Sequence, residues 1–141
     1  MNLRQELTSL EVATPGRGFT DVSSQLQKWL GEIKADNGLL TLFIRHTSAS
    51  LLVQENADPS VRKDLENVFQ RYAPDGDPSY QHDDEGPDDM PAHIRSALTQ
   101  TQLSIPVRAG RLHLGTWQAA YVWEHRHKPH RRELSLHYLG T

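Results

Sequence analysis

The stretch "LLTLFIRHTSASLLVQENADPSVRKD", residues 39–64, carries the pattern that decides the fold. Its first seven residues, 39–45, are apolar enough to form a strand that is buried on both faces. Residues 50–55 are predicted to form a neighbouring strand. A helix follows, because Asp58 is a favourable N-cap and Pro59 suits the first turn of a helix.

Outward from this stretch, the chain adds more strands than helices. Apolar residues at helical spacing predict a helix over 22–33 that is capped by Asp21, and a short helix over 91–101. The same spacing predicts a buried stripe on the helix that begins at Pro59, made by Val61, Leu65, Val68, Phe69 and Tyr72. Further strands are predicted over 3–12, 103–108, 111–123 and 133–139, with a hairpin turn at Gly110-Arg111 and a bulge at Gly115. We therefore expect one α+β domain over residues 1–141, with two or three helices and largely antiparallel sheets packed like a β-sandwich.

Composition excludes several classes of protein. The chain has 141 residues and a net charge of −3, which does not favour a general nucleic-acid binder. It has no cysteine, so disulfides, thiolate metal sites and a cysteine nucleophile are excluded. No apolar run reaches the ~20 residues of a membrane span, and the first residues lack the apolar core of a signal peptide. We therefore expect a cytoplasmic protein.

Three of the eight histidines could form a metal site. His46 ends a predicted strand, His82 lies in a long acidic loop over residues 74–91, and His93 begins a short helix. Three imidazoles with an open position suit zinc-type catalysis, and the acidic residues near His82 could orient them. Among these, Asp89 could also be a ligand. The alternative is structural: a buried histidine, a loop residue and a helix-terminal residue.

The segment from Glu124 to Arg132 is locally basic and could hold a phosphate group, since Arg binds phosphate through two parallel hydrogen bonds. The alternative is a solvated turn between two strands. Glu124 lies near a strand end, where it could be a catalytic acid or base or one half of an ion pair.

Other polar residues are weaker candidates. His46 and Ser48 share one face of a strand, but a serine hydrolase also needs an orienting carboxylate and an oxyanion hole, and the chain has no G-x-S-x-G elbow. Ser48 more simply lines a pocket. Asn56 is also a candidate pocket residue. Asp58 could line the pocket too, but its position is explained by its role as a helix cap. Trp117 is either a platform for the substrate or a core side chain beside a bulge.

Several sequence motifs together resemble those of the YjbQ family, an uncharacterised family of secondary thiamine-phosphate synthases. The resemblance covers nearly the whole chain. It is carried by "HTSASL" (46–51), "ENADPSVRKDLE" (55–66), "YQHDDEGPDDMPAHI" (80–94), "SIPVRAGRLHLGTWQ" (104–118) and "EHR" (124–126).

The resemblance implies an α+β fold with a β-sandwich core, a homotrimer and a metal-bearing pocket near the subunit contacts. It implies His46, His82 and His93 as metal ligands, and places Asn56, Asp58, Glu124 and Arg126 among the pocket candidates. The implied activity joins a pyrimidine methyl diphosphate to a thiazole phosphate and releases diphosphate. Zinc, manganese or iron suits imidazole ligands better than magnesium, the usual partner of diphosphate.

Three functions follow as expectations. The first is a metal-dependent enzyme acting on a small phosphorylated substrate, with thiamine-phosphate synthesis as its specific reaction. The second is a metal-assisted hydrolase in which Glu124 or a loop carboxylate such as Asp89 is the general base. The third is a trimeric protein that binds a metal or ligand without turnover.

Overall fold

The larger of two sheets buries alternate residues of its strands, as the period of two in a strand requires. The computed structural model describes residues 2–141. The sheet has the strand order β1-β8-β3-β5-β6, and every neighbouring pair is antiparallel. In β8, Leu134, Leu136 and Tyr138 face the core while the residues between them face outward. The five strands are β1 (Arg4–Thr14), β8 (His130–Gly140), β3 (Gly38–Ile44), β5 (Gln102–Arg108) and β6 (Arg111–Leu112).

The smaller sheet has the order β2-β7-β4 and is also antiparallel. Its strands are β2 (Gly18–Asp21), β7 (Gln118–Glu124) and β4 (Ala49–Glu55). All of β7 except its first residue is buried, because apolar side chains lie against both of its faces. Val122 belongs to the core shared with the larger sheet, while the ring of Trp123 packs against Phe69 of helix α2 (Pro59–Tyr72).

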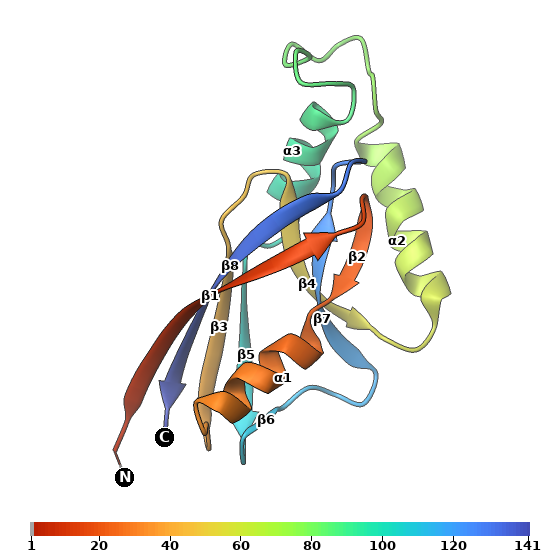
Figure 1. Cartoon of the computed structure of the whole chain (residues 1–141). Coiled ribbons are helices and arrows are strands. Elements are labelled where there is room, and N and C mark those ends of the chain that lie inside the picture. Colours follow the sequence, from red (N-terminus) through yellow and green to blue (C-terminus); the bar gives the residue numbers. More distant parts are fainter. Residues whose placement is uncertain (1) are drawn as a thin grey trace.

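Three helices complete the fold: α1 (Ser23–Glu32), α2 (Pro59–Tyr72) and α3 (Asp89–Leu98). Helix α1 buries Leu26 and Leu30 in the common core. Helices α2 and α3 lie at the same end of the molecule, joined by the acidic loop that rises above them (Figure 1). These observations confirm the predicted α+β fold with antiparallel sheets.

Local predictions differ from the structure in four places. Strand β3 is not buried on both faces, because Leu39 and Phe43 are exposed. The strand predicted over 111–123 is interrupted, because Gln118 Oε1 accepts the N–H of Gly115 at 2.7 Å and residues 113–117 leave the sheet. The hairpin between β5 and β6 turns at Ala109 and Gly110, both with positive φ, one residue earlier than expected. On α2 the predicted stripe is only half-buried, and Tyr72 is exposed.

The helix starts were predicted more closely. Asp58 is the N-cap of α2, and its Oδ1 accepts the N–H of Ser60 at 2.9 Å. Asp21 bonds the N–H of Ser23 at 2.8 Å, although the N-cap position of α1 belongs to Val22. Within residues 2–141, no helix has the length and apolar character to cross a membrane.

Candidate metal centre

Four possible metal ligands meet where the acidic loop enters α3. His82 and Glu85 come from the loop, and Asp89 and His93 lie one turn apart on the same face of α3. One ligand atom from each lies within 4.8 Å of the others. Asp89 Oδ2 is at the centre of the group, 2.6 Å from Nε2 of His82 and 3.2 Å from Nε2 of His93.

Arg126 fixes the central carboxylate from behind. Its Nη1 donates to Asp89 Oδ1 at 2.7 Å, so Oδ2 is the oxygen that faces the two imidazoles. Its Nε donates to Asp88 Oδ2 at 3.1 Å and its Nη2 to the carbonyl of Glu85 at 2.8 Å. With its guanidinium committed in this way, Arg126 positions the loop and Asp89, and is not free to bind a substrate phosphate as the sequence suggested.

The rest of the acidic loop is also anchored to the sheets. Arg17 makes a two-pronged ion pair with Asp75, at 2.9 and 3.1 Å, and His127 donates to the same carboxylate at 2.7 Å. The N–H of Gly76 bonds the carbonyl of Pro87 at 3.0 Å and closes the loop on itself. The loop therefore presents His82 from a defined position.

The side chains of this group shift the pKa values of Asp89 and His82 in opposite directions. Burial would raise the pKa of Asp89, but hydrogen bonds and the charge of Arg126 outweigh it, so the pKa lies below its usual value. The hydrogen bond to Asp89 raises the pKa of His82 above 6.5. In the absence of a metal, both shifts favour an ionised Asp89 beside a protonated His82.

The donor set suits a transition metal ion. Two imidazole nitrogens with one or two carboxylate oxygens are typical ligands of zinc, manganese or iron, whereas magnesium prefers oxygen ligands alone. Asp89 offers a single oxygen to the group, because Arg126 holds the other. His82, Asp89 and His93 would hold the ion, with Glu85 within reach as a fourth ligand.

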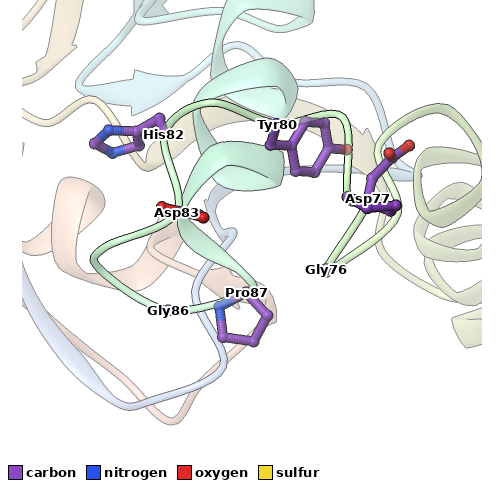
Figure 2. A pocket seen from close by; sticks show the side chains of 8 residues that line it. Gly76, Asp77, Tyr80, His82, Asp83, Gly86 and Pro87 are labelled. Carbon is purple, nitrogen blue, oxygen red and sulfur yellow. The ribbon is translucent and has the colours of Figure 1, made fainter.

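A cavity of about 290 Å³ borders this group. Figure 2 shows the side chain of His82 on one side of it, the ring of Tyr80 in the middle and Asp77 on the far side. The remaining lining residues are Gly76, Pro78, Asp83, Gly86 and Pro87. Of the four possible ligands, His82 alone lines the cavity, and its ring points away from Tyr80 and Asp77 (Figure 2). The sequence analysis did not identify Tyr80 or Asp77, and only their place in a long loop could have indicated them.

His46, the third ligand suggested by the sequence, lies outside this group. Its Nε2 accepts the backbone N–H of Glu133 at 2.7 Å, so that lone pair is not available to a metal. Its Nδ1 lies 3.4 Å from Nη1 of Arg132, a cationic neighbour that disfavours a metal ion. The structure therefore brings together His82 and His93 but not His46, and Asp89 takes the third place.

Glu124 is fully buried in an ion pair and is not suited to be a general base. Its carboxylate accepts from Thr14 Oγ1 at 2.6 Å, from Arg132 Nε at 2.8 Å, and from the N–H of Arg126 at 3.1 Å. Burial raises its pKa, but these hydrogen bonds and the charge of Arg132 outweigh burial and lower it. The ion-pair alternative is thus the one observed. Ser48 accepts from Arg132 Nη2 at 3.0 Å beside this pair.

Three predicted substrate contacts lie at the other end of the smaller sheet. Ala49 pairs with Glu124 at the end near the metal group, whereas Glu55 pairs with Gln118 at the far end. Six residues of strand separate these ends by roughly 20 Å. At the far end, the N–H of Asn56 bonds the carbonyl of the exposed Trp117 at 3.0 Å, and Asp58 caps α2. Within one chain these residues do not join the metal group.

A buried polar layer under α2 and α3 was not foreseen. His125 Nε2 lies 2.8 Å from Ser50 Oγ, and burial keeps the pKa of His125 well below 6.5. Arg95 donates to Glu66 at 2.7 Å, and Glu66 also accepts from Trp123 Nε1 at 2.5 Å. This layer ties α3, which carries Asp89 and His93, to α2 and β7.

The chain is similar to a set of proteins without an assigned activity. The family model described as UPF0047 protein YjbQ-like matches residues 8–141. "UPF0047 protein sll1880" of Synechocystis sp. is 49% identical over 137 residues, which are 97% of this chain and 93% of that protein.

Two solved structures have the same fold. "Hypothetical protein APE1520" from Aeropyrum pernix is 32% identical, with a TM-score of 0.86 over 96% of this chain and 99% of that chain. "Conserved hypothetical protein TT1486" from Thermus thermophilus is 36% identical, with a TM-score of 0.83 over 92% of this chain and 97% of that chain.

Proposed function

The chain belongs to the UPF0047 (YjbQ-like) family, and we propose that it is a metal-dependent enzyme that acts on a small phosphorylated substrate. The observation that carries the proposal is the convergence of His82, Asp89 and His93, with Asp89 Oδ2 within 2.6 and 3.2 Å of the two imidazole nitrogens. We propose zinc as the metal, with manganese or iron as alternatives and magnesium disfavoured by the imidazole ligands.

A metal ion bound here would supply positive charge for a phosphate or diphosphate group and would lower the pKa of a bound water. The chain's own residues set the geometry around it. Arg126 holds Asp89 in one orientation, and the cavity beside His82 offers the ring of Tyr80 as a wall for the organic part of the substrate. The acidic groups Asp77 and Asp83 at the cavity favour a substrate whose organic part carries hydrogen-bond donors.

The specific reaction that we propose is thiamine-phosphate synthesis, as the family resemblance implies. The chemistry needs charge neutralisation on the leaving diphosphate and an apolar wall for the pyrimidine. The test is to incubate the zinc- or manganese-loaded protein with the pyrimidine diphosphate and the thiazole phosphate and to separate the products. A condensation product that His93→Ala abolishes and His137→Gln leaves unchanged supports the proposal; turnover that survives His93→Ala contradicts it.

Metal-assisted hydrolysis is the second candidate, and the carboxylate of Glu85 favours it. Arg126 bonds the backbone carbonyl of Glu85, and the Glu85 carboxylate lies 3.5 Å from Nε2 of His82 and is open to solvent. A carboxylate in this position could accept a proton from a water molecule. Hydrolysed phosphate ester in place of a condensation product would identify this reaction. Tight metal binding with no turnover of either kind would identify a binding protein.

We also propose the homotrimer that the family resemblance implies. The outer face of the larger sheet has no helix over it and exposes Leu7, Leu39, Phe43 and Leu139. Leu39 and Leu139 are direct cross-strand neighbours, and Thr41 and His137 lie between this pair and Phe43, so association would bury apolar side chains together with polar ones. Light scattering on the purified protein tests this, with a mass of three chains expected and a monomer as the contrary result. A cytoplasmic location also stays a prediction.

A further inference from the structure

The hydrogen bonds of His46 fix which of its nitrogens carries the proton. A backbone N–H can only donate, and that of Glu133 lies 2.7 Å from His46 Nε2. Nε2 is therefore the acceptor, and in the neutral ring the proton must be on Nδ1. Burial and the neighbouring charge of Arg132 lower the pKa of His46, which keeps the ring neutral. His46 Nδ1 is thus a hydrogen-bond donor.

This donor faces a second donor that also lacks an acceptor. Arg132 uses Nε and Nη2 to bond Glu124, and Nη2 also bonds Ser48. For Nη1 the one neighbour in hydrogen-bond range among residues 2–141 is His46 Nδ1, at 3.4 Å. Two N–H groups cannot bond each other, so each of these adjacent groups lacks an acceptor. The Arg132 side chain is only 5% exposed, which makes an unpaired N–H on it costly.

More donors surround the same place. Ser48 Oγ accepts from Arg132, so its own hydroxyl hydrogen remains free. Within the described chain, the backbone N–H groups of Thr47 and Ser48 have no acceptor. The two nearest carboxylates are already engaged: Glu124 by Arg132, and the side chain of Glu133 by Arg45 at 2.8 Å. The site is therefore rich in donors and poor in competing anions.

We propose that His46 Nδ1, Arg132 Nη1 and the Thr47–Ser48 segment bind a phosphate group or another tetrahedral oxyanion. Such a group carries several acceptor oxygens that can accept from both N–H groups and from the hydroxyl at once. The assignment gives His46 a role different from that of a metal ligand. It also places the phosphate contact at Arg132, one of the arginines in the basic segment 124–132, and not at Arg126.

The anion site is linked to the metal group through one carboxylate. Glu124 accepts from Arg132 on one side and from the N–H of Arg126 on the other, and Arg126 in turn holds Asp89. This chain of hydrogen bonds couples the position of Arg132 to that of Asp89. Assignment of the anion to the substrate rests on the proposed function, whereas anion binding itself does not need the metal.

A matched pair of substitutions separates the two roles of His46. The amide oxygen of His46→Gln can replace Nε2 and still accept from Glu133, but the donor at Nδ1 is lost. The amide N–H of His46→Asn replaces the donor at Nδ1, but the acceptor for Glu133 is lost. Binding of inorganic phosphate is measured by calorimetry on the full chain after removal of metals with a chelator, and thermal unfolding shows that each variant is folded.

We expect the metal-free wild type to bind phosphate, His46→Gln to bind it about tenfold or more weakly, and His46→Asn to bind it within about threefold of the wild type. No phosphate binding by the wild type, or equal affinity in His46→Gln, overturns the inference. Equal loss in both variants also overturns it, because the effect would then follow from packing and not from the donor. Metal content is measured separately, so failure of the anion site and failure of the metal site give different results.

Discussion

Substitution of Glu124 by Gln should strongly destabilise the protein. The carboxylate is fully buried and accepts hydrogen bonds from Thr14, from Arg132 twice and from the N–H of Arg126. The amide of Gln brings N–H groups where only acceptors fit. It also leaves the Arg132 guanidinium buried without a counter-charge.

The expected loss is about 3–5 kcal/mol of unfolding free energy, the usual cost of removing one partner of a buried ion pair. This is a large part of the total of roughly 5–15 kcal/mol for a domain of this kind. Urea unfolding followed by fluorescence measures it. The matched control is Glu133→Gln, which removes a carboxylate paired with Arg45 on the surface and should change stability by less than about 1 kcal/mol.

The pH dependence gives a second check on the same residue. The pKa of Glu124 in the folded protein is lower than in the unfolded chain, so its contribution is complete above the unfolded value of about 4.3 and is lost as the pH falls through the folded value. The difference in stability between wild type and Glu124→Gln should therefore shrink in acid. Equal stabilities of Glu124→Gln and Glu133→Gln at neutral pH would refute the reasoning.

Three further predictions concern the metal centre and α2. Arg126→Lys keeps a positive charge but cannot make all the contacts to Asp89 and the loop. Metal affinity, measured by competition with a chelator, should therefore fall about 10- to 100-fold. Unchanged metal affinity would contradict the positioning role of Arg126. In the metal-free protein, NMR titration should give His82 a pKa above 6.5 that Asp89→Asn brings back down, and metal affinity should weaken as the pH falls through that pKa. Asp58→Ala removes the cap of α2 and should lower Tm by about 3 °C, while an unaltered Tm would mean that the cap is dispensable.

The elements of the fold could be predicted where the sequence pattern is local. The alternation in residues 133–139 and the cap at Asp58 are both found in the structure. The strand predicted over 111–123 failed because one side chain, Gln118, bonds the backbone three residues away and draws the chain out of the sheet. Apolar periodicity contains no information about such a bond.

Prediction of the candidate site was limited by contacts between residues that lie far apart in the sequence. His82, Asp89 and His93 lie within twelve residues of one another, and the sequence placed all three among the candidates. Within one chain His46 lies outside this group, because its Nε2 accepts the backbone N–H of Glu133, 87 residues away. Arg126 and Arg132 are alike in sequence context, yet Arg126 faces the acidic loop and Arg132 faces Glu124. Only the pairing of distant strands decides which arginine keeps a free N–H group.

The metal content of the purified protein tests the central claim most directly. Elemental analysis would compare the wild type with His82→Ala/His93→Ala and with His46→Gln. We predict about one zinc, manganese or iron ion per chain in the wild type and in His46→Gln, and none in the double variant, provided that it is folded. Absence of metal from the wild type after reconstitution would contradict the account, and so would a loss of metal in His46→Gln as complete as in the double variant.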